Sequence, residues 1–114
     1  MKSPKIKQRD KLDKLWSQAV RKRDGICQRC RKTKASQAAH IFGRSNMATR
    51  WDLMNGIGLC YFCHIIWAHR QPVEFTLWVQ SRLKDDFKKL QTKAQGIKQW
   101  SLKEMETLER QLNG

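Results

Sequence analysis

The segment LCYFCHIIWAHR, residues 59–70, determines which fold the chain can adopt. Its cysteines, Cys60 and Cys63, have the Cys-x-x-Cys spacing of a zinc knuckle, and the same spacing recurs at Cys27 and Cys30. Zinc binds four ligands tetrahedrally, and two such turns supply four thiolates without a large hydrophobic core. Because the two pairs use all four cysteines of the chain, we predict a structural zinc site made of these four residues.

The 29 residues between the two pairs are too many for a compact zinc ribbon, so a further unit must be folded inside the metal loop. A zinc ion with four thiolate ligands has no open coordination position, so catalysis would need a different centre. His40, Asn55 and His64 are the candidates, because each carries a group suited to proton transfer, hydrogen bonding or metal binding. The alternative for each is structural: His40 as a hydrogen-bonded residue, Asn55 as part of an Asn-Gly turn, and His64 as a zinc ligand in place of Cys63.

The order CQRC, AAHIF and MNGIGLCYFCH, within residues 27–64, resembles the HNH nucleases. Their ββα-metal motif is often braced by four zinc-binding cysteines. The resemblance covers residues 27 to about 69, and it is strongest to small phage and prophage HNH proteins of the NinG recombination-nuclease type. It implies a zinc-braced ββα-metal core. It also implies a metal-dependent DNA endonuclease, acting in phage DNA processing or recombination, that leaves a 5′-phosphate and a 3′-hydroxyl.

The resemblance also implies a role for each candidate residue. His40 would be the general base that activates water, and a neutral imidazole with an ordinary pKa near 6.5 suits that task. Asn55 would orient the strand that carries His40. His64 would bind one divalent cation, either Mg²⁺, Mn²⁺ or another transition metal, that stabilises the leaving oxygen.

One position departs from the family pattern. In much of the family an acidic residue or a histidine precedes the catalytic histidine and binds the metal, whereas here that residue is Ala39. His69 and Asp52 are therefore the alternatives for a second ligand. On a straight α-helix, residues five apart point about 140° away from each other, so His64 and His69 would share an ion only if the helix bends or ends between them. Otherwise His69 is a helix-end histidine.

The charge of the chain predicts a polyanionic partner. The formal net charge is +14, from 24 Lys and Arg against 10 Asp and Glu, and 13 of these basic residues lie within residues 1–34. Clustered positive charge binds the phosphates of nucleic acid without sequence preference, so we expect DNA, duplex or branched, as the partner. The residues expected to contact DNA are Arg21, Lys22, Arg23, Arg44 and Arg50.

Length and hydrophobic periodicity predict one domain of the α+β class, mainly helical. We expect a disordered basic tail at residues 1–9 and a single nuclease domain at 10–114. Within the domain, the predicted zinc-braced core spans residues 25–71 and the C-terminal helices span 73–112.

The expected elements follow from local patterns. A first helix begins near residue 10 and ends at 23–25. A strand covers 36–42, a loop covers 43–58, a short helix follows the second knuckle, one long helix covers 73–94, and the SLKE motif at 101–104 starts the last helix.

No apolar run is long enough to cross a bilayer and the N-terminus lacks a secretory signal, so we expect a cytoplasmic protein that is not bound to membranes. The apolar stripe of the last helix suits either a monomer, in which it covers the core, or a homodimer. A second interpretation of the sequence is a zinc-knuckle module that binds DNA without cleaving it.

Overall fold

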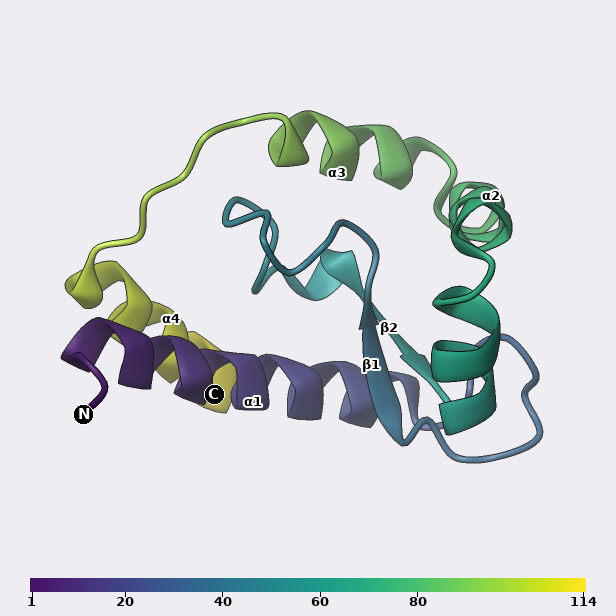
Figure 1. The fold of residues 1–114 in the computed structure, drawn as a ribbon, viewed down its shortest axis with the longest axis horizontal. Coiled ribbons are helices and arrows are strands. Elements are labelled where there is room, and N and C mark those ends of the chain that lie inside the picture. Colours follow the sequence, from purple (N-terminus) through teal and green to yellow (C-terminus); the bar gives the residue numbers. More distant parts are fainter.

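The computed structural model describes all 114 residues and confirms the α+β class, mainly helical. Figure 1 shows α1 and α4 on one side, α2 and α3 arching over the other, and a two-stranded hairpin between them. No helix combines the length and apolar character that crossing a bilayer requires. The elements are α1 (Pro4–Asp24), β1 (Gln37–His40), the 3-10 turn η1 (Leu53–Asn55), β2 (Gly56–Leu59), the π-helix η2 (Phe62–Ala68), α2 (Pro72–Leu83), α3 (Asp85–Ala94) and α4 (Leu102–Asn113).

The first helix begins at Pro4, so the prediction of a disordered tail at residues 1–9 is wrong for most of that segment. Ser3 caps the helix, because its Oγ accepts a hydrogen bond from the N–H of Ile6 at 3.2 Å, and Pro4 suits the first helical position. Tertiary contacts also hold the first turns. Gln8 is buried and its Nε2 donates to Glu109 Oε1 of α4 at 2.7 Å, a partner 101 residues away that local patterns cannot reveal.

The hairpin pairs β1 with β2 in antiparallel register, with Ala39 opposite Ile57 and His40 opposite Gly56. The prediction that residues 43–58 form a loop is wrong at its end, where β2 begins. Its glycines suggested a loop, but they allow α1 to approach the strand closely. A Cβ on Gly56 would lie 2.6 Å from both Trp16 Cζ2 and Val20 Cγ2, so no larger residue fits there.

The single helix predicted for residues 73–94 is two helices. The chain turns at Lys84, which adopts a φ of 54°, and its N–H closes α2 by donating to the carbonyl of Gln80 at 2.9 Å. Asp85 and Asp86 then occupy the first turn of α3, where negative charge is favoured by the helix dipole. Periodicity did not reveal this break because the apolar spacing continues across it.

The last helix begins as predicted, with a capping box between Ser101 and Glu104. It packs on α1 of the same chain and buries Met105 in a cluster with Leu12, Trp16 and Trp51. A second cluster joins the hairpin, η2, α2 and α3. The hairpin therefore lies between two hydrophobic clusters, which fix the positions of His40 on β1 and of the segment that follows β2.

Candidate functional site

The four cysteines lie together, as predicted. Their sulfur atoms are all within 4.8 Å of one another, and the Sγ atoms of Cys30 and Cys60 are 3.9 Å apart. Four thiolates arranged tetrahedrally around zinc at about 2.3 Å would be about 3.8 Å apart. The cluster could therefore hold a structural metal such as zinc.

Short backbone hydrogen bonds shape the first knuckle. The N–H of Cys27 donates to the carbonyl of Thr33 at 2.8 Å, and Arg31, at φ 55°, donates its N–H to the carbonyl of Cys27 at 3.0 Å. Burial raises the pKa of the Cys27 thiol, but N–H groups of Cys60, Cys30 and Arg29 outweigh burial and bring this pKa to about 6. The thiolate form that binds metal is thus favoured at Cys27.

Arg29 is a residue of this cluster that sequence reasoning missed. Its guanidinium carbon lies 3.9 Å from the centre of the Trp67 ring, and its Nη1 donates to Cys63 Sγ at 3.5 Å. A zinc ion with four thiolates carries a net charge of −2, so a cation held against one sulfur reduces the cost of burying it. The sequence feature that could have identified Arg29 is its position as a basic residue between Cys27 and Cys30.

The histidine of β1 is held in one tautomer. His40 Nε2 lies 3.0 Å from the carbonyl oxygen of Arg50, and because a carbonyl only accepts, Nε2 carries the proton and Nδ1 keeps its lone pair. The ring stacks on Trp16, with ring centroids 3.9 Å apart and planes 9° from parallel. Burial lowers the pKa of His40, so its imidazole is neutral at pH 7. Nδ1 can therefore accept a proton.

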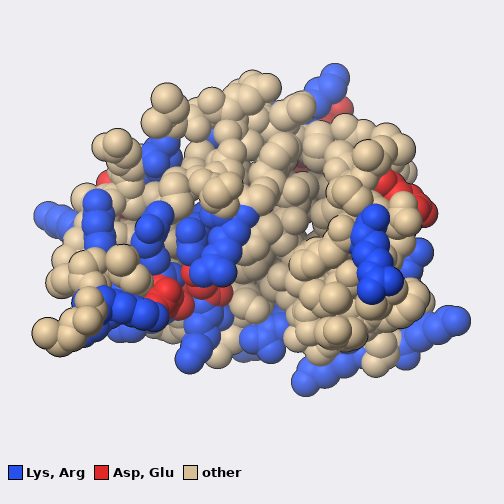
Figure 2. All heavy atoms as spheres, in the orientation of Figure 1, with Lys and Arg blue, Asp and Glu red and all other residues tan.

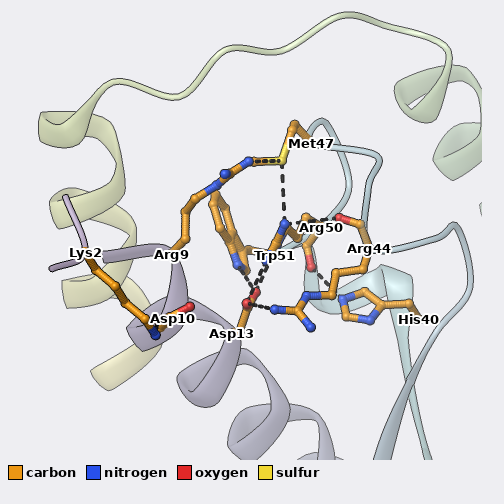
Figure 3. A network of polar contacts seen from close by, with 9 residues as sticks. All are labelled: Lys2, Arg9, Asp10, Asp13, His40, Arg44, Met47, Arg50 and Trp51. Carbon is orange, nitrogen blue, oxygen red and sulfur yellow. Dashed lines mark hydrogen bonds and ion pairs between the residues drawn. The ribbon is translucent and has the colours of Figure 1, made fainter. Parts of the chain in front are cut away.

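The carbonyl that orients His40 belongs to a loop fixed by Asp13 of α1 (Figure 3). Asp13 accepts two hydrogen bonds from Arg50, at 3.0 and 2.7 Å, one from Trp51 Nε1 at 2.8 Å and one from Arg44 Nη2 at 2.9 Å. Burial raises the pKa of Asp13, but the hydrogen bonds from Arg50 and Trp51 outweigh it and lower the pKa overall. Asp13 therefore stays ionised and links α1 to this loop.

Asn55 is completely buried and holds the segment that follows β1. Its Oδ1 accepts from the N–H of Phe42 at 2.7 Å, its Nδ2 donates to the carbonyl of Phe42 at 3.0 Å, and its backbone carbonyl accepts from the N–H of Ile41 at 2.9 Å. These three hydrogen bonds are next to His40 in the chain. Asn55 therefore fixes the backbone on the C-terminal side of that histidine.

His64 and His69 face each other, although residues five apart point away from each other on an α-helix. The segment between them is the π-helix η2, and the N–H of His69 donates to the carbonyl of His64 at 3.1 Å. Bonds of this i to i+5 type bring residues five apart onto one side. The Nε2 atoms are 3.1 Å apart, within hydrogen-bond distance, and with both nitrogens unprotonated these two residues could together hold a divalent cation.

A further residue orients His64. The Nδ1 of His64 lies 2.8 Å from Gln37 Oε1 on β1, so Nδ1 donates and the Nε2 lone pair faces His69. Burial, with the neighbouring His69 and His40, lowers the pKa of His64 to about 4, so this imidazole is neutral and able to bind metal at pH 7. Sequence reasoning did not identify Gln37, because only the fold of the hairpin brings it to η2.

All three histidines line one cleft of about 630 Å³, together with the exposed side chain of Arg44. Ala39 also lines it and provides no ligand. Asp52, the other alternative for a second ligand, points elsewhere: its carboxylate pairs with Lys93 at 2.6 Å and caps η1. The structure thus brings together His40, His64 and His69.

The residues predicted to contact DNA differ in how free they are. Arg50 has a side chain only 11% exposed and is bound to Asp13. Arg23 donates to Asp24 and to the carbonyls of Leu53 and Gly56, so its guanidinium connects α1 to the hairpin. Arg21 donates to Ser17 and is half-buried. Lys22 is exposed, and Arg44 is exposed although its Nη2 donates to Asp13.

Comparisons of this chain with protein-family models, with curated proteins and with solved structures find no match. The geometry of the cleft and the chemistry of the residues that line it are therefore the basis for inferring a function.

Proposed function

We propose that this chain is a metal-dependent DNA endonuclease of the HNH type, with β1, β2 and η2 forming a zinc-braced ββα-metal core. One observation carries the proposal: His40, with a free Nδ1, shares a cleft with the paired Nε2 atoms of His64 and His69. A general base and a cation site in one cleft are what phosphodiester hydrolysis requires.

Each residue would have a separate task. His40 Nδ1 takes a proton from a water molecule, whose oxygen attacks the scissile phosphorus. The P–O bond to the 3′ oxygen breaks, which leaves a 5′-phosphate and, after protonation, a 3′-hydroxyl. His64 and His69 would hold a divalent cation, which would supply stabilisation of the negative charge on the phosphate and the leaving oxygen. Arg44 adds a positive charge at the same cleft.

The ligand atoms favour certain cations. Two imidazole nitrogens suit a transition metal better than Mg²⁺, which prefers oxygen ligands. We therefore expect Mn²⁺ to support the reaction better than Mg²⁺. Ala39 provides no ligand, so His64 and His69 would hold the cation.

Purified zinc-loaded protein is expected to nick or cut plasmid DNA and branched DNA when Mn²⁺ is added and to cut neither substrate without a divalent cation. The matched variants are His69→Ala, which removes one proposed ligand, and the control Lys88→Ala, which changes an exposed residue of α3 that does not line the cleft. Cleavage that is absent in the wild type with Mn²⁺, Mg²⁺ and other divalent cations would contradict the proposal.

Gln37→Ala is expected to weaken Mn²⁺ binding by about 10- to 100-fold, the usual effect of removing a hydrogen-bond partner from a metal-binding histidine. Without the Oε1 acceptor, His64 is free to rotate and to change tautomer. Electron paramagnetic resonance titration of zinc-loaded protein with Mn²⁺ measures the affinity. Gln37→Glu keeps an acceptor and should retain most of it, and Ser36→Ala is the neighbouring control. Wild-type affinity in Gln37→Ala would show that Gln37 has no such role.

The absence of a ligand at Ala39, which is buried and lines the cleft, favours a second function: a zinc-braced module that binds DNA without cleaving it. In that case His40 would be structural, held by Arg50 and Trp16. The two functions differ in one result, because only the nuclease loses cleavage while keeping DNA binding when His40 is replaced.

A further inference from the structure

A second groove lies away from the three histidines, where the start of α1 meets the segment before α4. It has a volume of about 520 Å³. Its lining combines apolar side chains with three basic ones and contains no acidic side chain. The residues lining it that matter here are Lys5, Arg9, Met47, Lys98 and Trp100.

Arg9 is the residue that suggests a ligand. It has five N–H donors, and the only acceptor bound to it is the thioether sulfur of Met47, at 3.2 Å from Nη2. A thioether is a weak acceptor, so the guanidinium keeps most of its capacity to bind an anion. Arg23 and Arg50 differ, because each is bound to a carboxylate of the protein.

The charges around the groove leave an excess of positive charge. Lys98 is paired with Glu104 at 2.6 Å, and outside the lining Asp10 is paired with Lys2. Lys5 and Arg9 have no carboxylate partner. The ammonium of Lys98 lies 4.7 Å from the centre of the Trp100 ring, so that face is not open for a base to stack on. The groove thus suits phosphates rather than bases.

One face of α1 carries residues that contact both the lining of the groove and the lining of the cleft. Arg9, Asp13 and Trp16 lie on that face, where Asp13 holds Arg44 and Trp16 stacks on His40. Figure 3 shows Arg9, Arg44 and His40 following one another, with Met47 and Arg50 between them. In Figure 2, Lys and Arg side chains gather over the α1 side of this face of the molecule. From Trp16 to Arg9 the helix rises about 10 Å, the length of about three base pairs.

We propose that the groove binds the sugar-phosphate backbone of DNA that extends beyond the cleft, with Arg9 and Lys5 contacting its phosphates. This inference rests on the proposed function, because it takes DNA as the molecule in the cleft. It adds a contact site about three base pairs from the bond to be cleaved. It also explains why Lys5, Lys7 and Arg9 lie in turns of α1 that contain no proposed catalytic residue.

The test compares two double variants that each remove two positive charges. Lys5→Gln with Arg9→Gln changes the groove, whereas Lys34→Gln with Lys88→Gln changes two exposed lysines that do not line it. Fluorescence anisotropy with a labelled 20-base-pair duplex, without added divalent cation, gives the dissociation constant at several salt concentrations. In a plot of the logarithm of the dissociation constant against the logarithm of the salt concentration, the groove variant should have a slope about 2 lower than that of the wild type. Each phosphate contact contributes about 0.9 to this slope. The control variant should change it much less.

Two outcomes separate this inference from the nuclease proposal. Equal slopes for the groove variant and the control variant would overturn the groove, whether or not the wild type cleaves DNA. A reduced slope in the groove variant of a protein that cleaves nothing would support the groove and reject the nuclease.

If the wild type cleaves, the groove variant should require more DNA for half-maximal rate while keeping the wild-type rate at saturating DNA, because His40 and the cation site are unchanged.

Discussion

Replacing Cys60 with Ser is expected to unfold the protein at room temperature. The cysteine cluster connects the segment after α1 to the end of β2 and the start of η2, so three parts of the fold lose a common attachment. Structural zinc sites contribute about 10–16 kcal/mol in small domains, whereas the whole stability of a domain is about 5–15 kcal/mol. The chain therefore has little stability left once the metal is lost.

Circular dichroism and thermal unfolding of the purified variant, with zinc content measured by mass spectrometry, check this prediction. Stripping zinc from the wild type with a chelator should give the same loss of structure, and adding zinc back should restore it. His64→Ala is the control, because it removes a proposed ligand of the second cation next to Cys63 but leaves all four thiols. A Cys60→Ser variant with a wild-type melting temperature would show that the cluster does not hold the fold together.

Local patterns in the sequence were sufficient for features that depend on neighbours in the chain. The Cys-x-x-Cys spacing predicted the cluster, and Ser101 with Glu104 predicted the start of α4. The position of His40 between the two knuckles identified the residue that the fold places in the cleft. The capping box is a short segment, and the cysteine cluster and the position of His40 require only that the two Cys-x-x-Cys turns come together.

The features that were missed depend on residues far apart in the chain. Asp13 binds Arg50 and Trp51, which are 37 and 38 residues away, and Gln37 reaches His64 over 27 residues. No spacing rule connects such pairs. The π-helix was missed for a different reason: its apolar residues also fit an α-helix, and only the backbone hydrogen bonds show that His69 lies beside His64.

Replacing His40 is the change with the largest expected effect on activity. His40→Ala should lower the rate of DNA cleavage by about 10²–10⁴-fold, the usual contribution of a general base. DNA binding should remain, because His40 contributes no charge at pH 7 and the basic side chains are unchanged. His40→Gln is the sharper variant. Its amide N–H can replace the hydrogen bond to the carbonyl of Arg50, but it has no basic lone pair, so it should be equally inactive even though its fold is retained.

The pH dependence tests the same residue independently. The base acts in its neutral form, so the rate falls as the pH drops through the pKa of His40. Burial lowers that pKa, because the charged form loses hydration, so the acid limb should lie below the ordinary value of about 6.5. Single-turnover cleavage at saturating Mn²⁺ and DNA, measured from about pH 5 to 8, gives this midpoint. An acid limb above 6.5, or wild-type rates in His40→Gln, would mean that another group activates the water. If the wild type has the low midpoint and both His40 variants lose cleavage but still bind DNA, then burial keeps this histidine neutral for its role as the base, and the hydrogen bond to the carbonyl of Arg50 fixes its tautomer.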